Sequence, residues 1–515
     1  MGVLDGLEPQ SVFHFFEEIT RIPHGSGNVK QISDYLKKFA MDRGLECIQD
    51  ELYNIIMVKE ATAGYEDVEP YILQGHMDMV AVSRPDCDID MKKDPLHLCV
   101  ENNRIHAIGT SLGGDDGVAI AYILALLDAD NLSHPRLEII LTVDEETGME
   151  GAKGIDLSTL KGKRLINLDQ EEEGVIITSC AGGARVDVDI PLTEEIFTKE
   201  MLTGQGQQIC CLKVAGLQGG HSGIEINKGR GNSNCIAGRI LRGLSEHYAI
   251  RLISMRGGLA DNAIPRETES MFLVDITQID EMMGYIKEGE ERIRQELGDK
   301  DPDFKAECSL CEWQDALAAQ SHAAGGASAL AGQEPEAGKE TLKCCDAAST
   351  AQALSCFGKF PNGVIAMSRE LEGLVETSLN LGVVTLENGE LKLSYAVRSS
   401  VNEDRETLCK QMQEIAAREG ARADVRNAYT GWAYRKDSPL RDIVACVYEE
   451  MYGKKPILEA IHAGVECGIL AAKIPGLDCV SIGPDMSHVH TAEESIDIAS
   501  VQRMWEYLLA VLSRK

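Results

Sequence analysis

Short strand-forming runs alternate with apolar helical segments in the first part of this chain, and that alternation limits the possible folds more than any other feature. The strand candidates are residues 54–58, 71–74, 137–143, 165–168 and 175–179, and apolar residues recur at helical spacing in 8–21, 29–41 and 118–128. Strands that alternate with helices favour a mainly parallel sheet with helices on both faces. We therefore predict an α/β domain at the start of the chain.

The pattern changes after about residue 186. Strand candidates follow at 207–217, 268–276, 380–387 and 391–398, with helical candidates near 232–248, 278–297 and 402–419. This mixture indicates an α+β domain with an antiparallel sheet. The α/β pattern returns at Ser438 and Pro439, which suit a helix N-cap and the first helical residue, and residues 476–483 contain another buried strand.

A chain of 515 residues is too long for one compact core, so two or more domains are expected. We predict an α/β domain in two segments, residues 1–186 and 431–515, interrupted by an inserted α+β domain at 187–430. Within the inserted domain, residues 316–343 are rich in Ala, Gly, Ser and Glu. This composition predicts a flexible surface insertion.

The net charge of the chain limits the classes of partner that it is expected to bind. It has 83 acidic and 50 basic side chains, which gives a formal net charge of -33. Such a surface repels phosphate backbones and anionic lipid, so neither nucleic acid nor a membrane is an expected partner. The N-terminus lacks the features of a signal peptide, and the 16 cysteines have no regular spacing. We therefore expect a cytoplasmic protein with reduced thiols.

Histidines and carboxylates recur where predicted strands end. They lie in QGHMD at 74–78, GGDDG at 113–117, DEETG at 144–148, NLD at 167–169 and HVHTAEE at 488–494. Residues His76 and Asp78 are two apart, so both can point to one side of an extended segment. In that arrangement His76 could bind a metal while Asp78 accepts the other ring N–H.

Each of these motifs has a simpler interpretation when it is taken alone. The histidine pairs could be solvent-exposed, Asp115 could cap a helix, and the acidic run around Glu145 could be an exposed turn. The coincidence argues against these interpretations, because the carboxyl ends of parallel strands converge on one crevice. Five such segments carry the His and carboxylate ligands suited to zinc.

Together these segments resemble the dizinc peptidases that include aminoacylase-like and carboxypeptidase-like enzymes, dipeptidases and carnosinases. Within them the chain looks most like the cytosolic aminoacyl-histidine (Xaa-His) dipeptidases of the bacterial peptidase D type. The supporting stretches are IPHGSGN at 22–28, GGHSG at 219–223, NAIPRE at 262–267 and HAGVECG at 462–468. The resemblance covers nearly the whole chain and implies a catalytic domain in two segments with an inserted lid domain.

The resemblance implies the metal ligands. Asp115 would bridge two zinc ions, His76 and Asp169 would complete one of them, and Glu146 and His490 would complete the other. Cobalt or manganese could occupy the same set of nitrogen and oxygen ligands. The family's more usual Gly-Ala-Asp-Asn-Gly is Gly-Gly-Asp-Asp-Gly here, which alters local charge and hydrogen bonding but keeps the ligand position.

The resemblance also makes Asp78 the residue that orients His76 and Glu145 the general base. Two metals would lower the pKa of a shared water. Because neighbouring strand residues point in opposite directions, Glu145 is expected to be free of the metal when Glu146 binds it. Glu145 could then take the proton of the water and pass it to the departing amine.

Residues of the predicted lid would complete the site. His221 resembles the lid histidine that stabilises the oxyanion in relatives, although without the resemblance it would be interpreted as a loop histidine beside glycines. Arg398 is a candidate clamp for the substrate's C-terminal carboxylate, with an exposed strand-end arginine as the competing interpretation. Asn262 and Glu466 are further candidates for substrate contact.

The leading hypothesis is hydrolysis of small unblocked dipeptides, with aminoacyl-histidine substrates preferred. A second keeps the fold and metals but acts on N-acyl amino acids, tripeptides or modified cysteinyl dipeptides. A third is a non-catalytic binding protein, but the general base and all five ligands are present in the sequence. A homodimer is expected from the resemblance alone.

Overall fold

The computed structural model describes residues 2–321, 341–371 and 373–515. The chain forms two compact units: unit 1 is Met1–Cys180 with Gly431–Lys515, and unit 2 is Ala181–Thr430. The first division comes at Cys180 rather than at residue 186, because strand β9 (Gly182–Pro191) already pairs within the sheet of unit 2. Most of the insertion expected at 316–343 lies outside the described residues.

Unit 1 is built on an eight-stranded sheet. Its strands, in spatial order, are β1 (Glu46–Gln49), β2 (Ile55–Lys59), β6 (Leu137–Thr142), β3 (Tyr71–His76), β7 (Arg164–Asn167), β23 (Asp478–Ser481), β8 (Val175–Cys180) and β22 (Ile457–Ile461). The central pairs β6–β3, β3–β7 and β7–β23 are parallel, and so is β8–β22. This agrees with the mainly parallel sheet predicted from the sequence, while β1 and β2 add an antiparallel edge.

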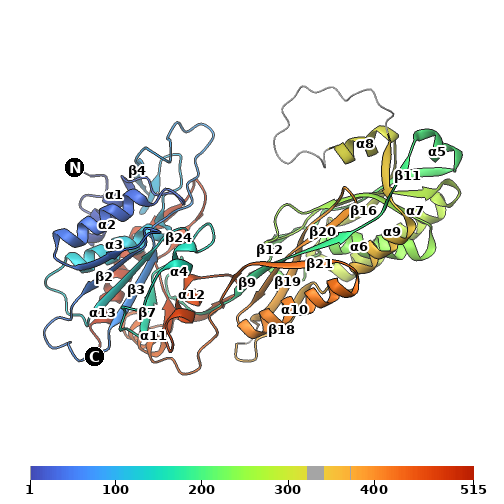
Figure 1. Ribbon diagram of the computed structural model, residues 1–515. Helices are drawn as coiled ribbons and strands as arrows, with labels where there is room; N and C mark the ends of the chain where they lie inside the picture. Colours follow the sequence, from blue (N-terminus) through green and yellow to red (C-terminus); the bar gives the residue numbers. More distant parts are fainter. Residues whose placement is uncertain (1, 322–340, 372) are drawn as a thin grey trace. The chain divides into compact units, whose positions relative to one another are not determined.

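Helices lie on both faces of this sheet. They are α1 (Gln10–Thr20), α2 (Lys30–Asp42), α3 (Gly114–Asp128), α4 (Glu150–Gly154), α11 (Pro439–Tyr452), α12 (Glu466–Lys473) and α13 (Ile498–Leu512). Leu73 and Leu141 belong to the core formed with α1, α2, α3, α11 and α13, helices of unit 1 that are labelled in Figure 1. The alternate residues Gln74 and Thr142 point the other way and hydrogen-bond Glu466 at the start of α12, which places α12 on the opposite face.

The start of α11 shows how sequence signals fix an element on the sheet. Ser438 caps the helix by accepting a hydrogen bond from the Arg441 amide at 3.1 Å, and Pro439 is the first helical residue, as predicted. The Ser438 hydroxyl also donates to Asp478 on β23 at 2.6 Å. The cap therefore joins the second chain segment to the central sheet.

Unit 2 contains an antiparallel sheet. Its strands, in spatial order, are β16 (Lys305–Cys311), β11 (Gln207–Ala215), β15 (Thr268–Asp275), β13 (Arg251–Gly257), β19 (Val375–Glu387), β20 (Glu390–Ser399), β9 and β21 (Arg422–Tyr429), and β18 (Gly363–Met367) also pairs with β19. One core lies between this sheet and the helices α6 (Ser233–His247), α7 (Ile279–Leu297), α9 (Ala347–Cys356) and α10 (Asn402–Arg418). Helices α6, α7 and α10 agree closely with the helices predicted near 232–248, 278–297 and 402–419, whereas α9 was not predicted.

A second, smaller core covers the other face of the unit 2 sheet. Alternating residues of β11 separate the two cores, since Cys210 and Leu212 face the helices while Ile209 and Cys211 face the smaller core. The elements around that smaller core are α5 (Lys199–Gly204), α8 (Trp313–Ser321), β10 (Glu194–Phe197) and β17 (Leu342–Cys345).

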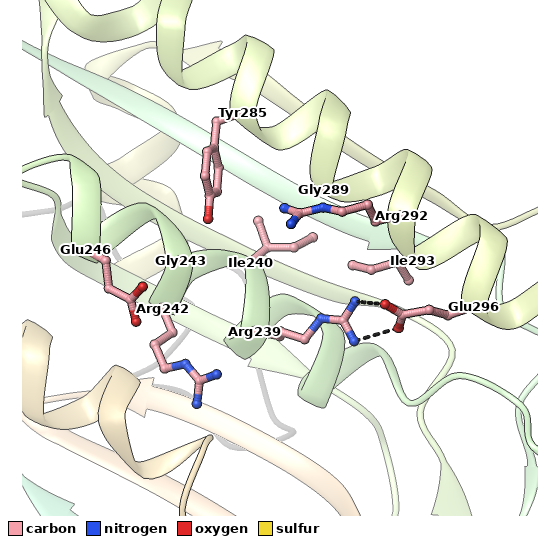
Figure 2. Close-up of a pocket in the computed structure, with 10 residues that line it drawn as sticks. All are labelled: Arg239, Ile240, Arg242, Gly243, Glu246, Tyr285, Gly289, Arg292, Ile293 and Glu296. Atoms are coloured by element: carbon pink, nitrogen blue, oxygen red, sulfur yellow. Dashed lines mark hydrogen bonds and ion pairs between the residues drawn. The ribbon is translucent and has the colours of Figure 1, made fainter.

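A hollow of about 310 Å³ opens between α6 and α7 of unit 2 (Figure 2). Arg239 and Glu296 form a bidentate ion pair across it at 2.7 and 2.8 Å, and Tyr285 and Arg292 contribute to its lining. The hollow contains none of the site residues predicted from the sequence.

All 16 cysteines lie in the described ranges and are free thiols. Among the described helices, none is both long enough and apolar enough to cross a membrane.

Candidate metal centre

Three neighbouring parallel strands of unit 1 end level with one another. In the register of the sheet His76, the last residue of β3, lies opposite Thr142, the last residue of β6, and Gln74 lies opposite Asn167, the last residue of β7. Glu146 lies in the turn after β6, and Asp169 follows β7 by two residues. The common edge of the sheet therefore gathers side chains from these ends, as the parallel pattern predicted.

Asp115 and His490 reach this edge from other elements. Asp115 lies in the first turn of α3, which packs against β3. The sequence predicted that the His490 segment follows β23 directly, but in the structure another strand comes between them. Strand β24 (Met486–Ser487) lies between β23 and His490 in the chain. It belongs to a small sheet with the strand order β24, β25 (Ser495–Asp497), β5 (Arg104–Ala107) and β4 (Leu98–Glu101). His490 lies in the turn between β24 and β25, with a φ of 65°.

The five predicted ligands meet around the carboxylate of Asp115. Its Oδ1 atom lies 2.9 Å from His76 Nε2, and its Oδ2 atom lies 3.1 Å from His490 Nε2. Glu146 Oε1 is 3.0 Å from the same nitrogen of His490, and Asp169 Oδ1 is 3.6 Å from His76 Nε2. Each oxygen of Asp115 therefore faces one histidine and one further carboxylate.

The electrostatics of this cluster show how strongly it attracts positive charge. Hydrogen bonds to Asp115 and Glu146 raise the pKa of His490 to about 11. Burial opposes a charge on His76, yet its hydrogen bonds to Asp115 and Asp169 raise its pKa well above the ordinary value. Burial also raises the pKa of Asp169 to about 6. Two protonated histidines thus offset carboxylates that would otherwise repel one another.

The donor set suits divalent cations. Asp115, Glu146 and His490 each offer a ligand atom within 4.8 Å of the others, and His76, Asp116 and Asp169 form a second such group. Imidazole nitrogens and carboxylate oxygens are ligands that zinc and related transition metals accept. The residues present therefore fit a metal centre, and Asp115 can serve both halves of it.

Glu145 lies beside the cluster for a different reason from the one predicted. It and Glu146 occupy a turn after β6 ends at Thr142, so strand alternation does not separate their side chains. Both offer a carboxylate oxygen within 4.8 Å of a His76 ring nitrogen. Burial is the main cause that raises the pKa of Glu145 well above the ordinary value.

Asp78 holds His76 mainly through its backbone. The Nδ1 atom of His76 lies 2.9 Å from the carbonyl oxygen of Asp78 but 3.6 Å from its carboxylate. The carboxylate accepts hydrogen bonds from the Ser26 hydroxyl at 2.8 Å and from the Glu145 amide at 3.1 Å. Asp78 therefore fixes both the ring of His76 and the turn that carries Glu145.

Glu466 differs from its predicted role. Its side chain has no exposed surface, and its Oε2 atom accepts hydrogen bonds from Gln74 at 2.5 Å and from Thr142 at 2.6 Å. Asn167 in turn donates to Gln74 at 2.6 Å. Glu466 therefore joins the ends of β3 and β6 from beneath through its Oε2 atom.

The residues that bind Glu466 were missed by sequence reasoning, although a signal was present. Gln74 and Thr142, which hydrogen-bond Glu466, and Asn167, which donates to Gln74, are polar residues at or near the ends of the largely apolar strands β3, β6 and β7. Asp116, noted only as a departure from the family motif, is fully buried and accepts a hydrogen bond from the His76 amide at 3.1 Å. Gln74, Thr142 and Asn167 therefore support the strand ends, while Asp116 both holds the His76 backbone and lies within reach of the group formed by His76 and Asp169.

The three candidates in unit 2 lie on neighbouring segments. His221 on β12 (Gly220–His221) pairs with Ala263 on β14 (Ala263–Ile264), which directly follows Asn262. Asn380 of β19 donates to the carbonyl of Ala263 at 2.8 Å and so ties this segment to the strand beside β20, which carries Arg398. Burial lowers the pKa of His221, and the charge of Arg398 lowers it further.

The ring of His221 has a defined orientation. Its Nδ1 atom accepts hydrogen bonds from the amides of Gly223 at 3.2 Å and Ile224 at 3.3 Å. In the neutral ring the proton must then be on Nε2, so this nitrogen is a hydrogen-bond donor. Arg398 is nine-tenths buried, which contradicts the alternative of an exposed strand-end arginine.

Known proteins resemble this chain over its full length. It is 34% identical over 513 residues to the cytosol non-specific dipeptidase of Escherichia coli (strain K12), which covers 99% of each chain. The aminoacylhistidine dipeptidase of Vibrio alginolyticus has the same fold, with a TM-score of 0.87 and 32% identity over 99% of this chain and 97% of that one. An aminopeptidase of Bacillus cereus ATCC 10987 shares the fold at a TM-score of 0.53 and 16% identity, over 98% of both chains.

These similarities confirm the predicted fold class, an α/β catalytic domain in two segments interrupted by an α+β lid domain. The sequence model of peptidase family M20/M25/M40 matches residues 72–514, which include all five predicted metal ligands and Glu145. The chain therefore belongs to peptidase family M20/M25/M40.

Proposed function

We propose that this peptidase is a two-zinc dipeptidase that hydrolyses small unblocked dipeptides and prefers aminoacyl-histidine substrates. The observation that carries the proposal is the position of Asp115 between His76 and His490, with one carboxylate oxygen facing each ring. Family membership supports peptide hydrolysis, and the relatives from Escherichia coli and Vibrio alginolyticus, at 34% and 32% identity, are both named as dipeptidases.

The ligand assignment follows from the distances. Asp115 would bind both metals, with His76 and Asp169 on one and Glu146 and His490 on the other. Zinc is favoured by the mixture of imidazole and carboxylate ligands, and cobalt or manganese would be the natural substitutes.

When bound, two such cations would lower the pKa of a shared water and polarise the scissile carbonyl. Glu145 would then act as the general base, take the proton of the attacking water and deliver it to the departing amine. Its position in the turn after β6, tied to Asp78 through its amide, holds the carboxylate near His76.

Three side chains of unit 2 are assigned to the substrate. His221 would donate from Nε2 to the oxyanion, since its Nδ1 is already an acceptor of two backbone amides. Arg398 would bind the C-terminal carboxylate, with Asn262 as a further contact. Glu466 is assigned instead to holding the strand ends that carry the ligands, because it is fully buried.

The proposal also covers the cellular location of the enzyme and its oligomeric state. We expect the enzyme to act in the cytoplasm, in line with the cytosolic relative from Escherichia coli. A homodimer remains a prediction, which light scattering on the purified protein would check directly.

The central experiment is a kinetic panel on protein stripped of metal by a chelator and reconstituted with zinc, cobalt or manganese. The panel compares Xaa-His dipeptides, including carnosine, with other dipeptides, tripeptides, N-acyl amino acids and modified cysteinyl dipeptides. We expect two bound zinc ions per chain and the highest kcat/KM for Xaa-His dipeptides. A higher kcat/KM for an N-acyl amino acid than for every free-amine dipeptide would contradict the dipeptidase assignment.

The panel also tests the finer substrate preference. One relative is named non-specific and the other aminoacylhistidine-directed. Equal kcat/KM values across dipeptides would retain the dipeptidase assignment and reject the preference for histidine at the C-terminal position.

A further inference from the structure

One buried carboxylate, Glu494, accepts hydrogen bonds from four successive backbone amides around Asp115. Its Oε2 atom accepts from Leu112 at 2.8 Å and Gly113 at 3.1 Å, and its Oε1 atom accepts from Gly114 at 2.8 Å and Asp115 at 3.4 Å. The residue is only 3% exposed. The Asp115 loop is thus wrapped around a single side chain from a distant part of the sequence.

The two glycines of the loop make this wrapping possible. Gly113 has a φ of 69°, in the left-handed region that favours glycine. A Cβ atom on Gly114 would lie 3.2 Å from Glu494 Oε1 and 2.6 Å from the Ile496 side chain. The Gly113-Gly114 pair therefore lets the backbone approach Glu494 more closely than other residues would.

The backbone of Glu494 is tied to the turn that carries His490. The Glu494 amide donates to the carbonyl of Thr491 at 3.2 Å, and the Thr491 amide donates to the carbonyl of His488 at 3.2 Å. Strand β25 begins at Ser495, immediately after Glu494, and pairs with β5. Glu494 therefore has its backbone in the His490 turn and its carboxylate in the Asp115 loop.

We propose that Glu494 is a positioning residue that holds Asp115 and His490 in place for one shared metal. This inference rests on the proposed function, because it concerns the metal bound by Asp115, Glu146 and His490. The Glu494 carboxylate lies against the non-helical segment that leads into helix α3, where it accepts hydrogen bonds from all four amides of residues 112–115. It aligns both ligands through the backbone and is not itself a ligand.

A purely structural role predicts a different result. If Glu494 only stabilised the fold, its removal would lower the free energy of unfolding and leave metal affinity unchanged in the folded protein. If it positions the two ligands, its removal weakens zinc binding in the folded protein, most for the metal that Asp115 shares with His490 and less for the metal that Asp115 shares with His76 and Asp169. Metal affinity of the folded protein therefore distinguishes the two roles.

The test replaces Glu494 with Gln, which keeps the size of the side chain but turns a donor NH₂ group toward two of the four amides. Its matched control is Glu493→Gln, since Glu493 is the adjacent residue, is exposed, and pairs with Arg84 on the surface at 3.1 Å. Zinc binding to each chelator-stripped protein is measured by competition with a chromophoric chelator. We expect the more strongly affected zinc ion to bind about 10–100-fold more weakly in Glu494→Gln, the other zinc ion to lose less affinity, and neither to change in Glu493→Gln.

Double variants identify which metal is affected. Adding Glu494→Gln to His490→Ala should produce a smaller further loss of zinc affinity than Glu494→Gln causes alone, because the more strongly affected metal is already lost. Adding it to His76→Ala should weaken both metals. Unchanged affinity for both zinc ions in folded Glu494→Gln would overturn the proposal.

Misfolding of Glu494→Gln and failure of the two-zinc function can each be distinguished from failure of this inference. If Glu494→Gln does not fold, Glu494→Asp is tested in its place. The shorter side chain keeps the charge but cannot reach all four amides. An unchanged zinc affinity in Glu494→Asp also overturns the inference. If the wild-type protein binds fewer than two zinc ions, the proposed two-zinc function fails, whatever the variants do.

Discussion

Asp115 and His490 are 375 positions apart in the chain, yet Asp115 Oδ2 lies 3.1 Å from His490 Nε2. The other oxygen of the same carboxylate lies 2.9 Å from His76 Nε2. Asp115 is therefore shared between two histidines, whereas each histidine faces only one side of it. Because of this asymmetry, removing Asp115 and removing one of the histidines should affect metal binding differently.

Replacing Asp115 with Ala should abolish the binding of both metals, while His490→Ala should abolish the binding of only one. The bridging carboxylate contributes to both sites, and His490 contributes to the site it shares with Glu146. Zinc content after dialysis against a zinc buffer, measured by inductively coupled plasma spectrometry, checks both expectations. His488→Ala is the control, since His488 is an exposed histidine in the same segment. Retention of one full zinc equivalent by Asp115→Ala would show that Asp115 does not bridge.

Replacing Glu145 with Gln should lower kcat by about 10²–10⁴-fold, because the amide cannot accept the proton of the attacking water. Zinc content should stay at the wild-type value, since Glu145 is assigned no ligand role. Glu150→Gln is the control, as Glu150 is an exposed glutamate five residues further along that pairs with Lys153 at 2.7 Å. Steady-state kinetics on a dipeptide decides the matter, and a wild-type kcat in Glu145→Gln would remove the general-base assignment.

Much of this site could be predicted because its signals are local. The runs that end at His76, Thr142 and Asn167 are apolar enough to be buried strands, and parallel strands bring such ends to one edge. Helix boundaries were also close to those observed. The segment predicted as 232–248 forms α6 (Ser233–His247), and the Asn232 side chain caps it by accepting a hydrogen bond from the Cys235 amide.

Other parts could not be predicted because adjacent residues with the same chemistry have different environments. Glu493 and Glu494 look alike in the sequence, but one is exposed beside Arg84 and the other is buried against four amides. Likewise, Glu145 and Glu146 lie in a turn where strand alternation gives no information. Strand β24 has only two residues, too few for any periodicity, so the path to His490 was not legible.

Zinc binding near neutral pH should release at least about one proton per histidine ligand. The pKa of His490 is raised to about 11 and that of His76 well above its ordinary value, so both rings are protonated in the stripped protein. A metal must displace these protons, and the apparent zinc affinity should therefore fall as the pH is lowered. Isothermal titration calorimetry in two buffers of different ionisation enthalpy measures the number released. Binding without proton release would contradict the assignment of the histidines as ligands.

Replacing Glu466 with Gln should change how the stability of the stripped protein depends on pH. Burial raises the pKa of Glu466 to about 8 from an ordinary value of 4.5, so the folded state holds a proton that the unfolded state loses between these values. Wild-type stability should therefore fall as the pH rises from about 5 to 8, by linkage. Gln carries no such proton, so the variant should lose less, by on the order of 1 kcal/mol or more.

Urea unfolding of both proteins at pH 5 and pH 8 measures the difference. Glu459→Gln is the control, because Glu459 is an exposed glutamate on the neighbouring strand β22. Parallel loss of stability in wild type and Glu466→Gln would show that Glu466 is not protonated in the fold. Glu466→Ala should be less stable than either, since it leaves the donors of Gln74 and Thr142 without their acceptor, at about 1–3 kcal/mol for each buried group.

Replacing Arg398 with Ala should raise KM for a dipeptide by about 10–100-fold, which corresponds to the loss of a charged hydrogen bond of about 1.5–3 kcal/mol. The substrate itself supplies the sharpest control. A dipeptide with a C-terminal amide lacks the carboxylate that Arg398 is proposed to bind, so wild type should already bind it weakly. Arg398→Ala should then hydrolyse the amide with nearly the wild-type kcat/KM.

An arginine that only supports the fold would lower kcat/KM for both substrates alike. Arg398 is nine-tenths buried and its side chain lies 3.5 Å from the Tyr429 hydroxyl, so such a role is physically reasonable. Arg422→Ala, at an exposed arginine of β21 in the same sheet, gives the baseline for loss of a surface charge. Selective loss with the carboxylate substrate therefore assigns Arg398 to the substrate's C-terminus, and equal loss with both substrates assigns it to the structure of unit 2.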